Sequence, residues 1–172
     1  MRCSNGCAVQ SATRWVGLTR RLLSREQDIQ IAVQMGLLMS EQLNVEAIRR
    51  IYQLTNDGDL TSVLKMMSDD VELFVFGSAK VPWAGHWRGR QGAEQFLVTM
   101  SKAAEVKDIS DVVVGAGDLV IAIHRPTVRI RATGREGDFN CVHVWTFRSG
   151  LVVRMKEYGD TAAWEAAFDE NI

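Results

Sequence analysis

Apolar residues after position 43 recur first at the spacing of α-helices. Val45, Ile48, Tyr52 and Thr55 stand three or four residues apart, and Gly58 follows them as a stop signal. A second, shorter helix is predicted over 60–67. A third apolar stripe, which begins near 89–92, consists of Ala93, Phe96, Leu97, Met100 and Ala104. This pattern predicts three helices, each of which buries one face.

The other apolar runs are short, rich in β-branched residues and separated by glycine turns, which is typical of strands. A short helix over 162–168, capped by Asp160, is predicted at the end of the chain. Helices followed by an antiparallel run of strands predict an α+β domain with the helices on one sheet face. The predicted strands cover 71–76, 112–114, 119–132, 139–147 and 151–158, with a tight hairpin at Arg148-Ser149-Gly150 between the last two.

Residues 1–42 differ from this pattern and are interpreted as an N-terminal extension. The stretch up to Arg25 contains five arginines and no acid, a bias typical of organellar targeting segments, and it lacks the apolar stretch of a secretory signal. Because Met39 would be a natural beginning, an upstream extension from a wrongly chosen start codon is the preferred interpretation. The third interpretation is that residues 25–38 form a real amphipathic helix. No chemistry is assigned to this segment.

The composition excludes several classes of function. The chain is 47% hydrophobic and 24% charged, and its formal net charge is −1, so no overall polyanion-binding surface is expected. No apolar run of about 18 residues is present, so no membrane-spanning helix is expected. No nucleic-acid partner is expected either, because interleaved aromatic residues are absent from the predicted basic outer face of Arg125, Arg129, Arg131 and Arg154.

Cysteine usage points to a reducing compartment. Cys3, Cys7 and Cys141 are odd in number and poorly spaced for a disulfide framework. The cytoplasm is therefore the expected location. Cys3 and Cys7 lack a second pair of ligands, and no phosphate-binding loop appears, so neither a metal nor an organic cofactor is expected.

Strand alternation places one carboxylate on an apolar face. In 151–158, the face that Glu157 continues holds Leu151, Val153 and Met155, while the opposite face is basic. A carboxylate in apolar surroundings needs a partner. Glu157 is therefore the first candidate for a functional group.

Two histidines are the candidate partners of Glu157. His143 shares a face with Cys141, Trp145 and Phe147, and the hairpin is expected to put it a diagonal step from Glu157. His124 lies among the apolar even positions of 119–132, although Pro126 leaves its orientation open. The three groups converge on one apolar face, as in small-molecule sites with acid/base chemistry. The alternative is that His143 and Glu157 satisfy each other inside the core.

Four stretches of the chain resemble the nuclear transport factor 2 / ketosteroid isomerase superfamily. They cover 51–60, 66–73, 82–97 and 147–160, and the last reads Phe-Arg-Ser-Gly-Leu-Val-Val-Arg-Met-Lys-Glu-Tyr-Gly-Asp. The resemblance implies a domain over 43–172 in which a cone-shaped, curved antiparallel sheet wraps on three helices and encloses an apolar pocket. It also implies a homodimer.

The site residues resemble those of the SnoaL-type polyketide cyclases. In these enzymes a histidine and an acid stand fourteen residues apart across the last hairpin, and His143 and Glu157 keep that spacing, with glutamate in place of aspartate. The ketosteroid isomerase base position falls on Val75, and an aspartate of the limonene-epoxide hydrolases is lost near Pro126. Neither of these two standard activities is therefore expected.

The resemblance implies a cofactor-independent acid/base enzyme of the isomerase, cyclase or hydrolase type that acts on a small apolar carbonyl compound. Glu157 and His143 would be its catalytic residues. The substrate-binding residues would be His124, Trp83, His86, Trp145 and Met155. Trp83 and His86 are expected in a loop before the third helix, where they would form a rim of the pocket mouth; the alternative is that the tryptophans of this loop only anchor it onto the domain. The alternative is a non-catalytic ligand-binding or dimerisation module of the same fold.

Overall fold

The computed structural model describes residues 7–107 and 110–169, and the chain divides into two compact units at Met39/Ser40. Helix α1 (Cys7–Asn56) extends through this boundary, so the described part of the first unit is helical. Residues 25–38 lie in this helix, where Ile29, Val33 and Leu37 are exposed. Among the helices of the described residues, none combines the length and the hydropathy that crossing a membrane requires.

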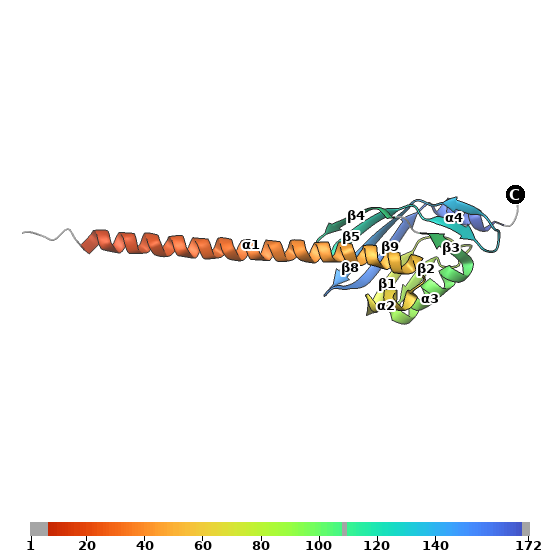
Figure 1. Ribbon diagram of the computed structural model, residues 1–172, viewed down its shortest axis with the longest axis horizontal. Helices are drawn as coiled ribbons and strands as arrows, with labels where there is room; N and C mark the ends of the chain where they lie inside the picture. Colours follow the sequence, from red (N-terminus) through yellow and green to blue (C-terminus); the bar gives the residue numbers. More distant parts are fainter. Residues whose placement is uncertain (1–6, 108–109, 170–172) are drawn as a thin grey trace, which may run out of the picture. The chain divides into compact units, whose positions relative to one another are not determined.

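The second unit is an α+β domain built on a six-stranded and a three-stranded sheet, which confirms the predicted fold class (Figure 1). The larger sheet has the order β2-β1-β9-β8-β5-β4, and the smaller has the order β3-β6-β7. The strands are β1 (Met67–Val75), β2 (Gly85–Arg88), β3 (Ala104–Lys107), β4 (Ser110–Ala116), β5 (Leu119–His124), β6 (Thr127–Ile130), β7 (Glu136–Asp138), β8 (Cys141–Arg148) and β9 (Leu151–Gly159).

Three further helices complete the domain: α2 (Leu60–Lys65), α3 (Gly89–Ala103) and α4 (Thr161–Phe168). Helix α3 packs beside β1 and β2 (Figure 1). The predicted cap of the last helix is confirmed, because the Asp160 carboxylate accepts a hydrogen bond from the Ala163 amide at 3.0 Å. Asp59 caps α2 in the same way through the Ser62 amide. Both side chains satisfy amides that the first turn of a helix leaves without partners.

The sheet is mixed, which corrects the prediction of a fully antiparallel one. Strands β1 and β9 pair in parallel, while the other pairs of the larger sheet are antiparallel. Strands joined by short hairpins must run in opposite directions. The two partners here are separated by most of the domain, so this restriction does not apply to them.

The predicted strand over 119–132 is two strands in different sheets. Strand β5 ends at His124, and β6 begins at Thr127 beside β3 and β7. Pro126 lies at the break, because it lacks an N–H for a sheet ladder. Its carbonyl instead accepts a hydrogen bond from the Phe139 amide at 3.0 Å. The chain therefore passes from the larger to the smaller sheet directly after His124.

The core lies between the inner face of the larger sheet and the helices. Strand alternation buries Leu73 on β1, Val120 on β5 and Met155 on β9. Helix α1 contributes Ile48, which is completely buried, from the predicted stripe. This packing leaves a cavity in which several polar side chains meet.

Candidate functional site

The β8–β9 hairpin sets the register of the site. Its turn has two residues, Ser149 and Gly150, whose φ angles of 53° and 78° are both positive, as a type I′ turn requires. Arg148 then pairs with Leu151 and Phe147 with Val152, but Thr146 pairs with Arg154. Val153 is thus an extra residue, a β-bulge that shifts the rest of β9 by one position.

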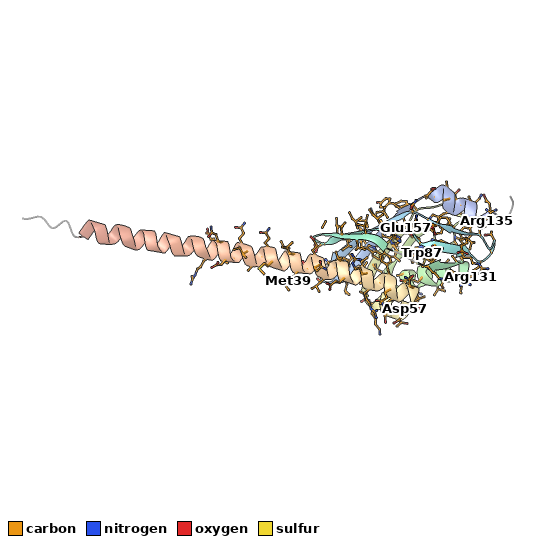
Figure 2. The ribbon with its side chains drawn as sticks, turned by 45° about the horizontal axis from the view of Figure 1, so that its top comes forward. Met39, Asp57, Trp87, Arg131, Arg135 and Glu157 are labelled. Carbon is orange, nitrogen blue, oxygen red and sulfur yellow. The ribbon has the colours of Figure 1, made fainter. Side chains whose placement is uncertain are left out.

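The bulge makes His143 and Glu157 direct cross-strand partners, rather than diagonal neighbours as predicted. It also corrects the predicted inner face before this point. Val152 is completely buried, whereas Leu151 is 37% exposed. Met155 and Glu157, which follow the bulge, are on the inner face as predicted, with Glu157 8% exposed among the side chains of the domain (Figure 2).

A line of hydrogen bonds connects Glu157 to helix α1. The Nε2 atom of His143 lies 3.1 Å from Oε2 of Glu157, and its Nδ1 atom lies 2.9 Å from the Tyr52 hydroxyl. Trp145 Nε1 donates to the same hydroxyl at 3.1 Å. The side chains of His143 and Glu157 are only 11% and 10% exposed, so the line is shielded from bulk water.

The chemistry of these groups favours one direction of donation along the line. An indole N–H is only a donor, so the Tyr52 oxygen accepts from Trp145. The Tyr52 proton is then available for Nδ1 of His143, and Nε2 of His143 carries the proton that points at Glu157. In this arrangement Oε2 of the Glu157 carboxylate accepts from Nε2 of His143.

His124 joins this group from β5. It is 3% exposed, and its ring centroid lies 4.0 Å from that of His143 and 5.2 Å from that of Tyr52. The break at Pro126 therefore does not turn His124 outward. The three ionisable groups that strand parity predicted on one face are all brought together.

The cavity beside these groups has a volume of about 80 Å³. Its polar side is formed by Tyr52, His124, His143 and Glu157, and its predicted lining residues Trp83, Trp145 and Met155 all border it. The remaining wall is largely apolar and includes Met67, Leu73, Phe96 and Leu97. Cavities for drug-sized ligands measure roughly 300–1,000 Å³, so a compact ligand, or movement of the wall, is required.

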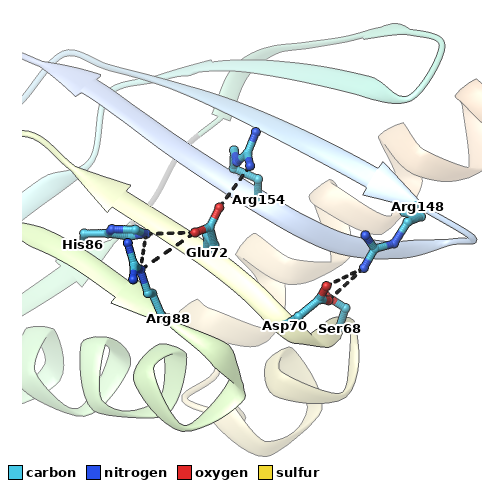
Figure 3. A network of polar contacts seen from close by, with 7 residues as sticks. All are labelled: Ser68, Asp70, Glu72, His86, Arg88, Arg148 and Arg154. Carbon is cyan, nitrogen blue, oxygen red and sulfur yellow. Dashed lines mark hydrogen bonds and ion pairs between the residues drawn. The ribbon is translucent and has the colours of Figure 1, made fainter.

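His86 is not among the residues that line this cavity, which corrects its predicted place at the pocket mouth. The segment expected to be a loop is strand β2, whose alternation turns His86 to the side opposite Trp87. The imidazole stacks on Phe74 with centroids 3.9 Å apart and lies 3.3 Å from Glu72 (Figure 3). Trp87 points the other way, and its indole donates to the carbonyl of Trp83 at 3.0 Å.

His86 belongs instead to a charged group on the outer face of the sheet (Figure 3). The Arg154 guanidinium hydrogen-bonds Glu72 at 3.0 Å and holds the pKa of that carboxyl below its usual range, against the opposing effect of burial. The nearby His86 also lowers the pKa of the Glu72 carboxyl. These exposed pairs organise the surface and do not reach the cavity.

Tyr52 is the member of the hydrogen-bonded line that the sequence prediction missed. It was assigned to the core stripe of the first helix, where its ring indeed lies, 6% exposed. The available signal was the phenol hydroxyl on a stripe that faces the core, because such a hydroxyl needs a partner when it is buried. Within the described residues, no group of three histidine, cysteine or carboxylate side chains is arranged as metal ligands are.

Known proteins resemble most of this chain in sequence and in fold. The chain is 29% identical over 132 residues to the uncharacterized protein Rv0034 of Mycobacterium tuberculosis (strain ATCC 25618 / H37Rv), a match that covers 74% of this chain and 98% of the relative. The crystal structure of an NTF2-like protein from Burkholderia xenovorans LB400 superposes with a TM-score of 0.68 at 26% identity, over 75% of this chain and 98% of that one.

A structure of TerC co-crystallized with polyporic acid is also similar, with a TM-score of 0.67 and 26% identity, over 73% of this chain and 98% of TerC. The SnoaL-like domain family matches residues 48–155. This segment contains all of the first helix after Ala47, much of the cavity lining and both histidines of the site, whereas Glu157 and Trp164 follow it in the chain. The chain therefore belongs to the SnoaL-like domain family.

Proposed function

We propose that the cavity is the active site of an acid/base enzyme of the cyclase, isomerase or hydrolase type, which acts without a cofactor on a small apolar carbonyl compound. The observation that carries this proposal is the line Tyr52–His143–Glu157, which ends on a shielded carboxylate beside an apolar cavity. A carboxylate placed in this way suits the removal of a proton from a carbon next to a carbonyl group. TerC, as a related protein crystallised with polyporic acid, supports a small organic ligand.

In the proposed reaction, an oxygen of Glu157 takes a proton from the carbon next to the substrate carbonyl. The electron pair of the broken C–H bond forms the enolate, and Glu157 returns the proton to the same or another carbon. His143 holds the carboxylate in place through Nε2. His143 is itself hydrogen-bonded to Tyr52, so residues of β8 and α1 together fix the position of the Glu157 carboxylate. A fixed position matters because a small misplacement of a catalytic group lowers the reaction rate.

The first proton transfer can be measured without knowledge of the natural substrate. Cyclic ketones incubated with the protein in D₂O should exchange their α-protons, as followed by ¹H NMR. Glu157→Gln should lower the exchange rate by about 10²–10⁴-fold. Lys156→Gln is the matched control, because Lys156 lies on the outer face of the same strand, over Phe74, and should exchange like the wild type.

A ligand-binding module is the second candidate function. It is favoured by the fact that both ring nitrogens of His143 are engaged by neighbouring side chains, as in a structural pair. Binding of cyclic ketones without α-proton exchange, in a protein whose Glu157→Gln variant binds equally well, would favour this function over the enzyme.

We further propose that a second copy of the chain covers the outer face of the sheet near β4 and β5. Val112, Val114 and Ile123 are 45–48% exposed there, next to one another in neighbouring strands. An exposed apolar patch of this kind is typical of an interface.

The cysteine content supports a reducing compartment, and we propose that the protein is located in the cytoplasm.

A further inference from the structure

Trp164 on α4 carries a buried polar atom that the proposed reaction does not use. The residue is 5% exposed, and its Nε1 atom has no hydrogen-bond partner among the described residues. Buried donors are nearly always paired, so an unpaired one calls for a ligand or water as its acceptor. Trp164 also lines the cavity beside Glu157, where such an acceptor would enter.

The surrounding contacts hold the indole in one orientation. Its ring stacks on Phe139 with centroids 4.0 Å apart and planes 10° apart, and the Trp83 ring meets it edge-on at 5.4 Å. The Nε1 atom lies beside Gly159, 3.5 Å from the position that a Cβ would take there. Because Gly159 has no side chain, no Cβ crowds the N–H, the Asn140 carbonyl or the Cys141 thiol at this place.

The register of the hairpin relates this N–H to the proposed base. Gly159 pairs with Cys141, and the next inward pair along the ladder is His143 with Glu157. Residues two apart on a strand share a face and are separated by about 7 Å. A hydrogen bond from the Trp164 N–H would place a ligand carbonyl oxygen at about 2.9 Å from Nε1. The C–H next to that carbonyl would then extend toward the Glu157 carboxylate, so a fragment of this size can bridge the two groups.

We propose that the indole N–H of Trp164 is the donor that binds the carbonyl oxygen of the ligand. The ligand class is therefore a compact apolar molecule with one hydrogen-bond acceptor at the end that lies between Gly159 and Glu157. The role of this donor in stabilising an enolate oxygen rests on the proposed function. The binding role does not, and it is tested separately.

The test compares two probes of nearly equal shape on the full-length ¹⁵N-labelled protein. Cyclohexanone carries the acceptor, and methylenecyclohexane replaces it by an apolar carbon. The chain has five tryptophans, and the Trp164→Phe variant identifies the Trp164 indole signal. Cyclohexanone should move this indole proton downfield and slow its exchange with water, whereas methylenecyclohexane should leave it nearly unchanged.

Affinities supply the second measurement. Trp164→Phe should weaken cyclohexanone binding by up to about tenfold, the effect of one hydrogen bond, and should leave methylenecyclohexane binding within twofold. Trp87→Phe is the control, since that indole already donates to the Trp83 carbonyl, and it should not change the preference between the probes. Three results would overturn the proposal. The first is a Trp164 indole chemical shift that does not change at saturating cyclohexanone, and the second is an equal loss of affinity for both probes in Trp164→Phe. The third is that neither probe binds.

The two proposals fail independently in this design. Glu157→Gln should lower the rate of α-proton exchange by about 10²–10⁴-fold and still show the ketone-induced shift of the Trp164 indole. A shift without exchange in the wild type would support the Trp164 donor and contradict the enzyme. Exchange without a shift would support the enzyme and contradict the donor.

Discussion

His143 and Glu157 face each other across the terminal hairpin because Val153 is bulged out between the turn and the site. Continued without the bulge, the register of Arg148 with Leu151 would pair His143 with Lys156. The inner side chain opposite the imidazole would then be a cation in place of a carboxylate. One extra residue thus decides the charge of the site, which fits the role of bulges in aiming side chains near active sites.

Deletion of Val153 should therefore damage the domain far more than a change of its side chain. The deletion would turn Met155 and Glu157 away from the interior or force β9 to lose its pairing with β8. We expect a loss of at least about 3 kcal/mol in the free energy of unfolding, in line with the removal of a large core side chain, as measured by urea denaturation. Val153→Ala keeps the residue count and should cost about 1 kcal/mol or less. Similar losses in both variants would contradict the role of the bulge.

Tyr52→Phe should disturb the line of hydrogen bonds while it keeps the ring that fills the core. The variant removes the hydroxyl that contacts Trp145 Nε1 and His143 Nδ1. We expect a loss of about 1–3 kcal/mol in stability, and a change in the ¹⁵N shifts of His143 away from the pattern of an Nε2–H tautomer. The control is Tyr158→Phe, at the chain's other tyrosine, which is 47% exposed. An Nδ1–H tautomer in the wild type would show that donation runs the other way.

The contact of Asp70 with Arg148 should make part of the stability depend on pH. Arg148 donates to both Asp70 oxygens at 2.8 and 2.7 Å, and Ser68 donates to one of them at 2.8 Å (Figure 3). These hydrogen bonds, that of Arg148 first, hold the pKa of the Asp70 carboxyl below its usual range. Because the folded pKa is the lower one, the stabilisation is present above the unfolded pKa of about 3.9 and is lost as the pH falls through the folded value.

In Arg148→Gln, the titration midpoint of Asp70 should rise toward its ordinary value, as followed by ¹³C NMR of the carboxyl carbon. The acid-side loss of stability should become less steep. Arg154→Gln is the matched variant, because Arg154 hydrogen-bonds Glu72; it should raise the midpoint of Glu72 and leave that of Asp70 in place. An Asp70 midpoint that does not respond to Arg148→Gln would contradict this assignment.

Ile123→Glu should convert the proposed dimer into a monomer. The side chain is 47% exposed on the outer face of β5, and a carboxylate there would be buried without a partner if a second copy packed against it. Sedimentation velocity of the full chain should show a dimer for the wild type and a monomer for the variant. Gln95→Glu, which adds the same charge on the exposed side of α3, should stay dimeric. A monomeric wild type would rule out the interface.

Local patterns in the sequence were sufficient for most of the secondary structure. The apolar stripe from Val45 to Tyr52, the turn at Ser149-Gly150 and the Asp160 cap are each determined by residues close together in the chain. The same holds for the faces of His124, His143 and Glu157, because strand alternation depends only on neighbouring residues. The α+β class could therefore be predicted, and so could His143 and Glu157 of the hydrogen-bonded line Tyr52–His143–Glu157.

Contacts between distant segments decided the remainder. The parallel pairing of β1 with β9, the move of the chain into a second sheet after His124, and the partnership of Tyr52 with His143 each join residues far apart in sequence. His86 was misplaced because nothing local distinguishes strand β2 from a loop until β1 pairs with it. Residue order fixes which side of its own element each side chain takes. Which elements become neighbours, and in what register, follows from the packing of the whole domain, and this packing brings Tyr52, His143, Glu157 and Trp164 around one cavity.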